Sequence, residues 1–507
     1  MKRHEALKDT GICMTEKLTD LLNGYPIVNL LGTFERDIES IAYDSRKVEA
    51  GGLFVALAGT REDGARYIPE ALRRKAAAFI TQSSPQQLLE FGVGVNGVTQ
   101  IHVKDARDAL SWISTRYYHQ PSQDLNLVGI TGTNGKTTLT FLLESVFQQA
   151  GKSCGVIGSI NYRFADTVCP ANVTTPESLD LNRILADMVA AKIENCFLEV
   201  SSHSLAQKRV HGLHFDMAVF TNLTRDHLDY HSDLHNYRET KMSLFRTERV
   251  GKQVINLDDP MGPKIVAETS RPTLTVGIDS KADIRAESID LSDQGVRFRL
   301  TGPYGSREIR SPLLGRHNIL NLLSAAAVGL FQGLSMDRVC SGLENLTEVP
   351  GRLEKIENTR GITVAVDFAH TDDALYNALL AVRGFTRGRV LVVFGCGGDR
   401  DRTKRGPMGK IAVDNSELAI VTSDNPRTED PLNIIEDIRL GLPEKAEEGR
   451  DFLVIPDRRQ AIEKALELAR EGDTVLIAGK GAEDYQIIGT EKIHFDDREV
   501  VRSLLNG

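Results

Sequence analysis

An α/β fold with several domains is predicted by two features of this 507-residue chain. Short apolar runs typical of strands alternate with amphipathic runs typical of helices, and such alternation indicates parallel sheets joined by crossover helices. The length also exceeds what one hydrophobic core usually serves, so several domains are expected.

Two breaks in the pattern divide the chain. The polar stretch QPSQD at residues 120–124 precedes an apolar run, and a Val-Pro-Gly sequence stands at residues 349–351. We therefore expect three domains with the boundaries 1–123, 124–350 and 351–507.

The clearest strand signals lie in the second and third segments. The middle segment has three predicted strands and, at residues 136–150, a helix; the strands are at 125–130, 195–200 and 216–223. The third segment repeats one theme, a strand-like run followed by a loop and helix-like sequence, at 362–368, 389–395, 418–424 and 474–479. In parallel sheets, ligands bind at the loops beyond the carboxyl ends of such strands.

Composition excludes several classes of protein. Hydrophobic residues make up 41% and charged residues 26%, as in soluble globular proteins, and the net charge of -9 disfavours nucleic acid as a partner. No apolar run approaches the ~18 residues of a membrane span, and the first thirteen residues are interpreted as an extension without a signal peptide. Six cysteines without a C-x-x-C pair favour a reduced, cytoplasmic location and no structural zinc.

The sharpest motif is TGTNGKTT at residues 131–138, between a predicted strand and a predicted helix. A phosphate loop needs small residues whose backbone N–H groups face anionic oxygens, a lysine for the terminal phosphates, and a hydroxyl for magnesium. Lys136 and Thr137 supply the last two. The match to G-x-x-x-x-G-K-[ST] is imperfect, because the first glycine would fall at Ile130. The alternative is a Gly-rich turn with a chance lysine.

Magnesium bound to ATP needs hard oxygen ligands, and candidates follow two later strands. Glu199 ends the run CFLEV, whereas Asp226 and His227 stand in TNLTRDHLDYH. Each of these carboxylates could instead be a helix cap or a surface charge.

The ordered motifs TGTNGKTT, LEVSSHSLAQKRV, TNLTRDHLDYH, GRHNILNLLSAAA, GRLE, DFAHTDDAL, FGCGGDRD, SDNPRTEDP and GKGAEDYQ resemble those of the Mur ligases of peptidoglycan synthesis. The resemblance runs from the N-terminal DSR to the final GKGAEDYQ. It implies a UDP-binding domain, a central P-loop ATPase domain with a parallel sheet, and a C-terminal Rossmann-like domain. It also implies that ATP converts a carboxylate into an acyl phosphate, which an amine then attacks.

Nucleotide and metal roles follow from the resemblance. The implied ATP-binding residues are Gly132, Thr133, Asn134, Gly135, Lys136, Thr137, Thr138, Asn318, Arg352 and Asp367. The implied catalytic residues are Lys136, Glu199, His227 and Lys241, and the implied Mg²⁺ ligands are Thr137, Glu199, His227 and Lys241. Lys241 stands where the family has a carbamylated lysine; by itself it would be interpreted as a lysine on a helix surface.

The implied nucleotide substrate is UDP-N-acetylmuramoyl-L-alanyl-D-glutamate, and the residues that would bind it are Ser45, Thr174, Thr175, Ser201, Gln207, Arg209 and His370. Arg209 is the natural partner of its carboxylates. Two departures from the family pattern affect this part of the site. Val173 interrupts the usual Asn-Thr-Thr-Pro, and residues 59–64 lack the His-Gln of relatives.

The implied incoming amine is meso-diaminopimelate, bound by Arg400, Asp424, Asn425, Arg427, Gly479 and Glu483. Arg427 offers a planar two-pronged donor for the distal carboxylate, and Glu483 could neutralise the ammonium. Ala482 departs from the usual histidine. A lysine-adding ligase is the first alternative. The folate-adding ligase that shares the ATPase core is disfavoured by DSR and DNPR, and a non-catalytic nucleotide switch is disfavoured by the retained catalytic set. We expect a monomer.

Overall fold

The computed structural model describes residues 15–59, 62–94, 97–224, 228–231 and 233–505. The predicted ligand His227 and its neighbour Asp226 lie outside these residues, as do the first thirteen. The predicted α/β class is confirmed, because sheets of five, eleven and six strands are accompanied by helices along the chain.

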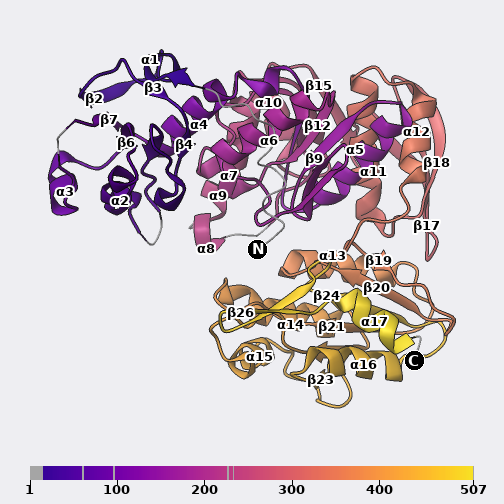
Figure 1. Cartoon of the computed structure of the whole chain (residues 1–507). Helices are drawn as coiled ribbons and strands as arrows, with labels where there is room; N and C mark the ends of the chain where they lie inside the picture. The colour runs from indigo at the N-terminus through magenta and orange to yellow at the C-terminus, as the bar shows by residue number, and fades with distance from the viewer. Residues whose placement is uncertain (1–14, 60–61, 95–96, 225–227, 232, 506–507) are drawn as a thin grey trace. The chain divides into compact units, whose positions relative to one another are not determined.

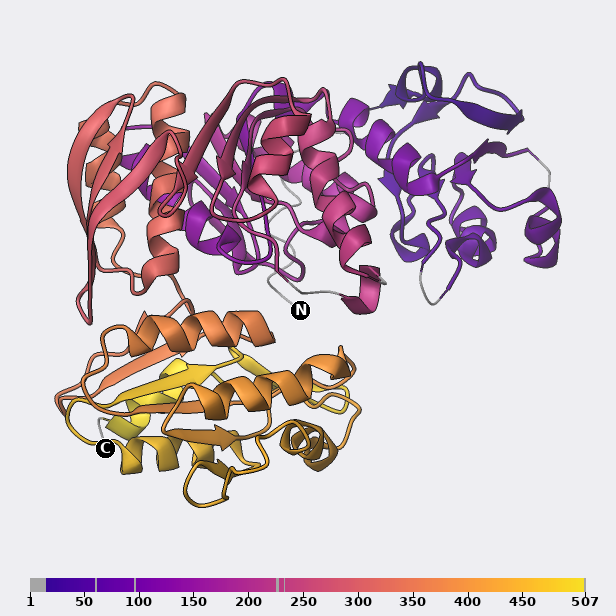
Figure 2. The same ribbon diagram turned by 180° about the vertical axis from the view of Figure 1, so that it is seen from behind.

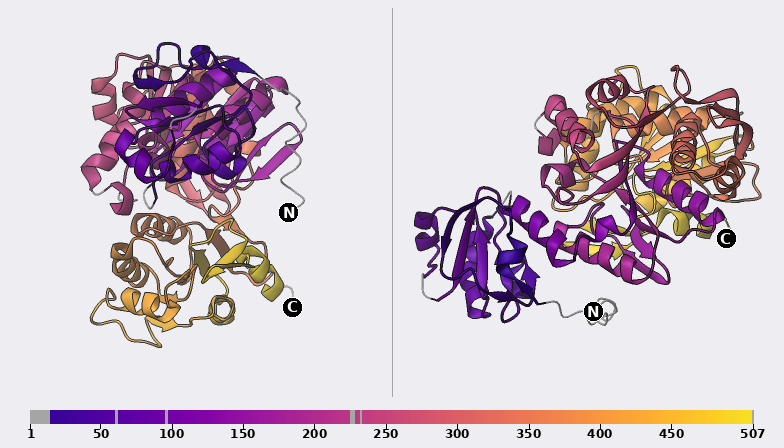
Figure 3. Two further views of the ribbon diagram at one scale, coloured as in Figure 1. Left: turned by 60° about the vertical axis from the view of Figure 1, so that its left-hand side comes forward. Right: turned by 90° about the horizontal axis from the view of Figure 1, so that it is seen from above.

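The first sheet has the order β2-β7-β6-β5-β4, with β2 antiparallel and the rest parallel. Apolar clusters cover both of its faces, one with α1 and α4, the other with α2 and α3. This part is indigo in Figure 3. Its main elements are α1 (Leu18–Leu21), β2 (Ile27–Leu31), β4 (Ile41–Ala42), β5 (Leu53–Val55), α2 (Ile68–Arg73), β6 (Ala78–Thr81), α3 (Pro85–Glu90), β7 (Thr99–Val103) and α4 (Ala106–Tyr117). Two short strands, β1 (Glu16–Lys17) and β3 (Asp37–Ile38), pair separately.

The second sheet has eleven strands in the order β11-β10-β9-β12-β8-β13-β14-β15-β16-β17-β18. The three strands predicted from sequence are confirmed as β8, β12 and β13, and the helix predicted at 136–150 is α5. The strands are β8 (Asn126–Thr131), β9 (Cys154–Ile157), β10 (Asn161–Phe164), β11 (Thr167–Pro170), β12 (Asn195–Glu199), β13 (Phe215–Phe220), β14 (Val250–Asn256), β15 (Thr273–Gly277), β16 (Ile284–Ser292), β17 (Gly295–Gly302) and β18 (Gly305–Ser311). The antiparallel meander β16–β18, which the sequence did not suggest, forms the long ribbon in Figure 2.

Among the described residues, eight helices belong to the same stretch of sequence as this sheet. They are α5 (Lys136–Gln149), α6 (Ser178–Ala190), α7 (Ser202–Ala206), α8 (Leu228–His231), α9 (Leu234–Arg246), α10 (Gly262–Glu268), α11 (Arg316–Phe331) and α12 (Met336–Asn345). The chain divides into two compact units. One comprises residues 1–129, 153–216 and 247–251, and the other comprises 130–152, 217–246 and 252–507. No helix among the described residues is long and apolar enough to cross a membrane.

The third sheet confirms the four strands predicted in the C-terminal segment. Its order is β19-β20-β24-β21-β22-β23, and all pairs except β19–β20 are parallel. Alternate strand residues face opposite sides of the sheet. Val392 packs with α13 (Asp372–Arg383), α14 (Arg405–Asp414) and α15 (Pro431–Arg439), whereas Val393 packs with α16 (Arg458–Leu468) and α17 (Asp497–Leu505). Figure 1 shows this helix–sheet–helix arrangement.

The bounds in this segment are β19 (Glu354–Lys355), β20 (Thr363–Asp367), α13 (Asp372–Arg383), β21 (Val390–Phe394), α14 (Arg405–Asp414), β22 (Leu418–Val421), α15 (Pro431–Arg439), β23 (Phe452–Val454), α16 (Arg458–Leu468), β24 (Thr474–Ala478), β25 (Tyr485–Ile488), β26 (Glu491–His494) and α17 (Asp497–Leu505). Because β20, β21, β22 and β24 are parallel, the loops after them lie at one edge of the sheet.

Candidate active site

The phosphate loop joins β8 to α5, as the motif predicts. Gly132 has φ +150°, and a Cβ there would lie 1.9 Å from the hydroxyl oxygen of Thr221. Gly135 has φ +88°, and a Cβ there would lie 2.5 Å from Oδ1 of Asn321. Both positions therefore require glycine, and the chance-turn alternative does not account for this close packing. A loop of this kind at the start of a helix is a ready-made site for phosphate.

Two lysines converge on this loop. Nζ of Lys136 donates to the carbonyl oxygens of Gly132 at 2.8 Å and Thr133 at 2.9 Å. Nζ of Lys241, from α9, donates to the same Gly132 oxygen at 2.8 Å and lies 4.7 Å from the ring centre of Tyr237. Lys241 is only 2% exposed, so the alternative of a surface lysine is wrong. The structure thus brings together two residues that the sequence placed 105 positions apart.

Other predicted nucleotide residues have protein partners. The hydroxyl of Thr133 lies 3.1 Å from that of Tyr237. Nδ2 of Asn134 donates to Asp373 at 3.0 Å, and Nη2 of Arg352 donates to Oγ1 of Thr137 at 3.2 Å. Thr138, in the first turn of α5, is buried.

Three more predicted residues make local contacts. Asn318 on α11 is buried and donates to the carbonyl of Leu314 at 2.8 Å. Asp367 ends β20 and accepts the backbone N–H of Leu353 at 2.7 Å; burial raises the pKa of this carboxyl. Nδ1 of His370 lies 2.9 Å from the carbonyl oxygen of Phe368. In this arrangement Asp367 fixes a backbone turn.

Glu199 anchors a second cluster at the end of β12. It is 1% exposed, and its carboxylate accepts the N–H of Ser159 at 3.0 Å and the hydroxyl of Ser159 at 2.9 Å. The hydroxyl of Thr174 lies 3.1 Å from that of Ser159. The hydroxyl of Thr175 donates to the carbonyl of Glu199 at 2.8 Å and accepts the N–H of Ser201 at 3.1 Å. Four predicted residues from two separate motifs therefore meet here.

Arg209 belongs to the same cluster. Its guanidinium donates to the carbonyl of Thr175 at 2.7 Å and to Oε1 of Gln207 at 2.7 Å, and it lies 3.5 Å from the carboxylate of Glu177. These contacts orient a cation among hydroxyls, which suits an anionic substrate. Ser45, which was predicted on the uracil side, is buried and donates to Glu70 at 2.6 Å.

The residues predicted to bind diaminopimelate, here called the C-terminal group, are Arg400, Asp424, Asn425, Arg427, Gly479 and Glu483. Arg427 and Arg400 form its cationic side. Arg427 is partly buried, and its Nη1 donates to the carbonyl of Gly398 at 2.9 Å. Burial, and next the charge of Arg400, lower the pKa of Arg427. A Cβ added to Gly397 would lie 3.0 Å from Nη1 of Arg427 and 3.8 Å from Cγ of Arg400. Two guanidinium groups on one loop edge favour a carboxylate ligand.

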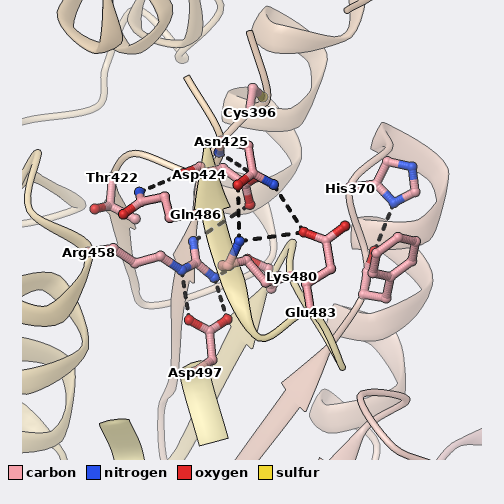
Figure 4. A network of polar contacts seen from close by, with 12 residues as sticks. His370, Cys396, Thr422, Asp424, Asn425, Arg458, Lys480, Glu483, Gln486 and Asp497 are labelled. Carbon is pink, nitrogen blue, oxygen red and sulfur yellow. Dashed lines mark hydrogen bonds and ion pairs between the residues drawn. The ribbon is translucent and has the colours of Figure 1, made fainter. Parts of the chain in front are cut away.

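The acidic side of this group is drawn in Figure 4. Nδ2 of Asn425 donates to Glu483 at 3.0 Å, and Nζ of Lys480 lies 3.5 Å from the same carboxylate. Burial raises the pKa of Glu483, although Lys480 opposes that shift. A Cβ at Gly479 would lie 2.6 Å from Oδ2 of Asp424. The predicted residues after β22 and β24 are thus brought together.

Sequence reasoning missed several members of these clusters. Lys480 is fully buried. Its place between the two glycines of the GKGAE motif, directly after an apolar strand, was the feature of the sequence that could have indicated this burial. Ser159 gave no signal, because nothing in its local sequence marks it, whereas Asp373 lies in the motif DFAHTDDAL but was assigned no role. Arg458 and Asp497 form a buried bidentate pair at 2.7 and 2.8 Å, visible in Figure 4, from elements 39 residues apart.

Some of the described side chains carry oxygen atoms that could be ligands of Mg²⁺. The described residues contain no group of three His, Cys, Asp or Glu side chains arranged to hold a metal. They do offer hard oxygen donors of the kind that Mg²⁺ prefers, in the Thr137 hydroxyl and the buried Glu199 carboxylate. Either group, taken singly within its own compact unit, suits an ion that is bound mainly through substrate phosphates with few protein ligands.

Three family models match the chain. They are "Mur ligase family, catalytic domain" at residues 37–118, "Mur ligase middle domain" at 130–329 and "Mur ligase, glutamate ligase domain" at 351–481. The chain is 46% identical to a UDP-N-acetylmuramoyl-L-alanyl-D-glutamate–2,6-diaminopimelate ligase of Geobacter metallireducens, over 93% of this chain and 94% of the relative.

Solved structures agree with these matches. A structure of a UDP-N-acetylmuramoyl-L-alanyl-D-glutamate–2,6-diaminopimelate ligase aligns with a TM-score of 0.69 at 33% identity, covering 97% of this chain and 99% of that one. The MurF ligase of Thermotoga maritima, solved with ADP, aligns with a TM-score of 0.62 at 18% identity, covering 92% and 96%. The second likeness shows a shared fold only.

Proposed function

The chain belongs to the Mur ligase family, and from this premise we propose that it joins meso-2,6-diaminopimelate to UDP-N-acetylmuramoyl-L-alanyl-D-glutamate at the expense of ATP. The names of the relatives contain the UDP-linked dipeptide and 2,6-diaminopimelate, whereas the meso form and ATP follow from the family resemblance. The observation that carries the choice of amine is the position of two arginines beside Gly397, where an added Cβ would lie 3.0 Å from Nη1 of Arg427 and 3.8 Å from Cγ of Arg400. Two arginines at one loop edge offer donors to a distal carboxylate. Lysine has no such distal carboxylate. We further propose a monomeric enzyme and, since the described cysteines are free thiols, a cytoplasmic location.

The reaction follows from the need for a leaving group. A carboxylate is a poor electrophile, so the γ-phosphoryl group of ATP is transferred to an oxygen of the glutamyl carboxylate, releasing ADP. The amine of diaminopimelate attacks the acyl carbon, and the bond to the phosphate oxygen breaks. The amine loses a proton, and the products are an amide and inorganic phosphate.

Each cluster has a role in this scheme. The glycines and Lys136 of the phosphate loop would receive the ATP phosphates, and Arg209 with its hydroxyl neighbours would receive the muramoyl dipeptide. Thr137, Glu199, His227 and a carbamylated Lys241 would hold Mg²⁺. When bound, that ion offsets the negative charge that accumulates as phosphate and carboxylate meet.

The test is a phosphate-release assay with UDP-N-acetylmuramoyl-L-alanyl-D-glutamate and a panel of amino acids. Phosphate should accumulate only when ATP, this substrate and meso-diaminopimelate are all present, and Lys136→Ala should abolish release. Equal release with L-lysine would establish the lysine-adding alternative. Release without any amine would contradict the ligase proposal.

A further inference from the structure

A cavity of about 250 Å³ is lined by none of the residues assigned to the candidate active site. Its walls include Trp112, Arg116, Gln120, Gly212 and Arg249. None of the lining residues, all within the described chain, is acidic, although two are arginines. We propose that this cavity binds a small oxyanion, either a phosphate or a compact polycarboxylate. The proposal does not depend on the ligase reaction.

Arg116 provides the first donor group. It stands one helical turn after Trp112 on α4, and its guanidinium carbon lies 3.7 Å from the centre of the indole ring. Stacking covers one face of the guanidinium and leaves its in-plane N–H groups directed outward. Among the described residues, these N–H groups have no carboxylate or carbonyl partner.

Arg249 provides the second donor group. Its Nη1 donates to the carbonyl of Gly212 at 2.7 Å, which fixes the side chain while leaving other N–H groups available. Burial, followed by the charge of Arg249, lowers the pKa of Arg116. The two cations are therefore close enough to repel each other, and no acidic wall residue compensates them. An oxyanion in the cavity would turn this repulsion into two charge-assisted contacts.

Gln120 provides a third donor group, and the size of the cavity suits a small oxyanion. Gln120 adopts left-handed backbone angles, with φ 58°, and its Oε1 accepts from Gln123 at 2.6 Å. Its own amide N–H groups are thereby available as donors toward an anion. The volume of the cavity equals that of several water molecules at ~30 Å³ each. A cavity of this size suits a phosphate or a tricarboxylate.

Trp112 makes the test direct, because it is the only tryptophan in the chain. Its fluorescence should change in a saturable way as inorganic phosphate or citrate is added to the full-length protein at constant ionic strength, with chloride as the control ion. Arg249→Gln should weaken the apparent affinity by about ten-fold or more, because one charge-assisted contact is lost. Arg459→Gln, an exposed arginine elsewhere, should leave it unchanged.

Two further measurements keep the result interpretable. Lys136→Ala should retain the fluorescence response, which separates this cavity from the phosphate loop. The same anion should raise the melting temperature of the wild-type protein, and it should raise that of Arg249→Gln by less. A melting transition in Arg249→Gln also shows that this variant is folded. A response to phosphate alone or to citrate alone identifies the ligand type. No saturable response to either, or equal affinity in wild type and Arg249→Gln, would overturn the proposal.

Discussion

The ammonium group of Lys241 and the carbonyl oxygen of Gly132 are joined by a hydrogen bond of 2.8 Å. Lys136 donates to the same oxygen at the same distance. Two ammonium groups that share one acceptor repel each other, and one of them is almost fully buried. Carbamylation of Lys241 would remove this repulsion, because it replaces a cation by an anion and still leaves one N–H to donate to Gly132.

We therefore predict that the activity depends on carbon dioxide. Enzyme stripped of CO2 should lose most of its ligase activity, and bicarbonate should restore it. Lys241→Ala should lower kcat by about 100-fold or more, because the new ligand oxygens beside the phosphate loop are absent. The measurement is phosphate release with and without bicarbonate.

Lys264→Ala serves as the matched control, since this lysine is exposed on α10. It should keep wild-type activity and the same response to bicarbonate. If stripped wild-type enzyme is fully active and indifferent to bicarbonate, Lys241 acts as an unmodified lysine.

The burial of Lys241 could have been anticipated from its helix. Tyr237, Lys241 and Phe245 are spaced by four residues, so they share one face of α9, and all three are buried. A lysine on an apolar stripe is therefore a signal in itself. Its partner could not have been anticipated, because Gly132 is distant in sequence and only tertiary packing brings the two together.

Gly132→Ala should destroy nucleotide binding. The added Cβ would lie 1.9 Å from the Thr221 hydroxyl and 2.9 Å from the backbone oxygen of Asn222, so the loop must move. Gly151→Ala is the control, because Gly151 also has positive φ, +76°, but nothing lies within 4 Å of its Cβ. It should cost about 1 kcal/mol of stability and leave nucleotide affinity intact. Calorimetry with ADP compares the two; equal affinities would contradict the assigned phosphate loop.

The ion pair between Glu429 and Arg405 predicts a pH dependence of stability. Arg405 is 1% exposed and holds both carboxylate oxygens of Glu429, at 2.9 and 3.0 Å. Arg405 lowers the pKa of Glu429 to about 2. A depressed carboxyl pKa stabilises the folded state above the ordinary value of 4.5, and this contribution is lost as pH falls toward about 2.

Glu429→Gln should therefore lose about 2 kcal/mol of unfolding free energy at neutral pH and show a weaker acid dependence. Melting temperatures at several pH values between neutral and acidic measure both effects. The control is Glu463→Gln, an exposed residue of α16. Parallel curves for wild type and Glu429→Gln would show that this pair does not control the acid response.

The C-terminal group shows what strand patterns can and cannot predict. Parallel strands place their following loops at one edge, so the sequence correctly brought Asn425 and Glu483 together. It assigned Glu483 to the ammonium of the incoming amine, whereas in the structure Lys480 lies 3.5 Å from that carboxylate. Pairing depends on side-chain packing behind the loop, which no strand pattern encodes.

Arg427 should determine the preference for meso-diaminopimelate over L-lysine. Its backbone is held on both sides, since its N–H donates to Ile487 at 3.0 Å and its carbonyl accepts from Gly489 at 2.7 Å. Its guanidinium donates to the carbonyl of Gly398 and faces the like charge of Arg400. A distal carboxylate would satisfy both cations, whereas lysine would leave them opposed.

A site built around one polar group can reject the analogue that lacks it by roughly ten-thousand-fold. Arg427→Ala removes both the attraction for diaminopimelate and the penalty for lysine, so kcat/KM for diaminopimelate should fall far more than kcat/KM for lysine. Arg402→Ala is the control, because Arg402 pairs with Glu429 at 2.8 Å and is itself largely exposed. It should leave the ratio between the two amino acids near the wild-type value. Lysine need not become a good substrate for Arg427→Ala, since Arg400 and Asn425 remain. An unchanged ratio in Arg427→Ala would mean that another residue selects the amine, and the choice of diaminopimelate would lose the observation that carries it.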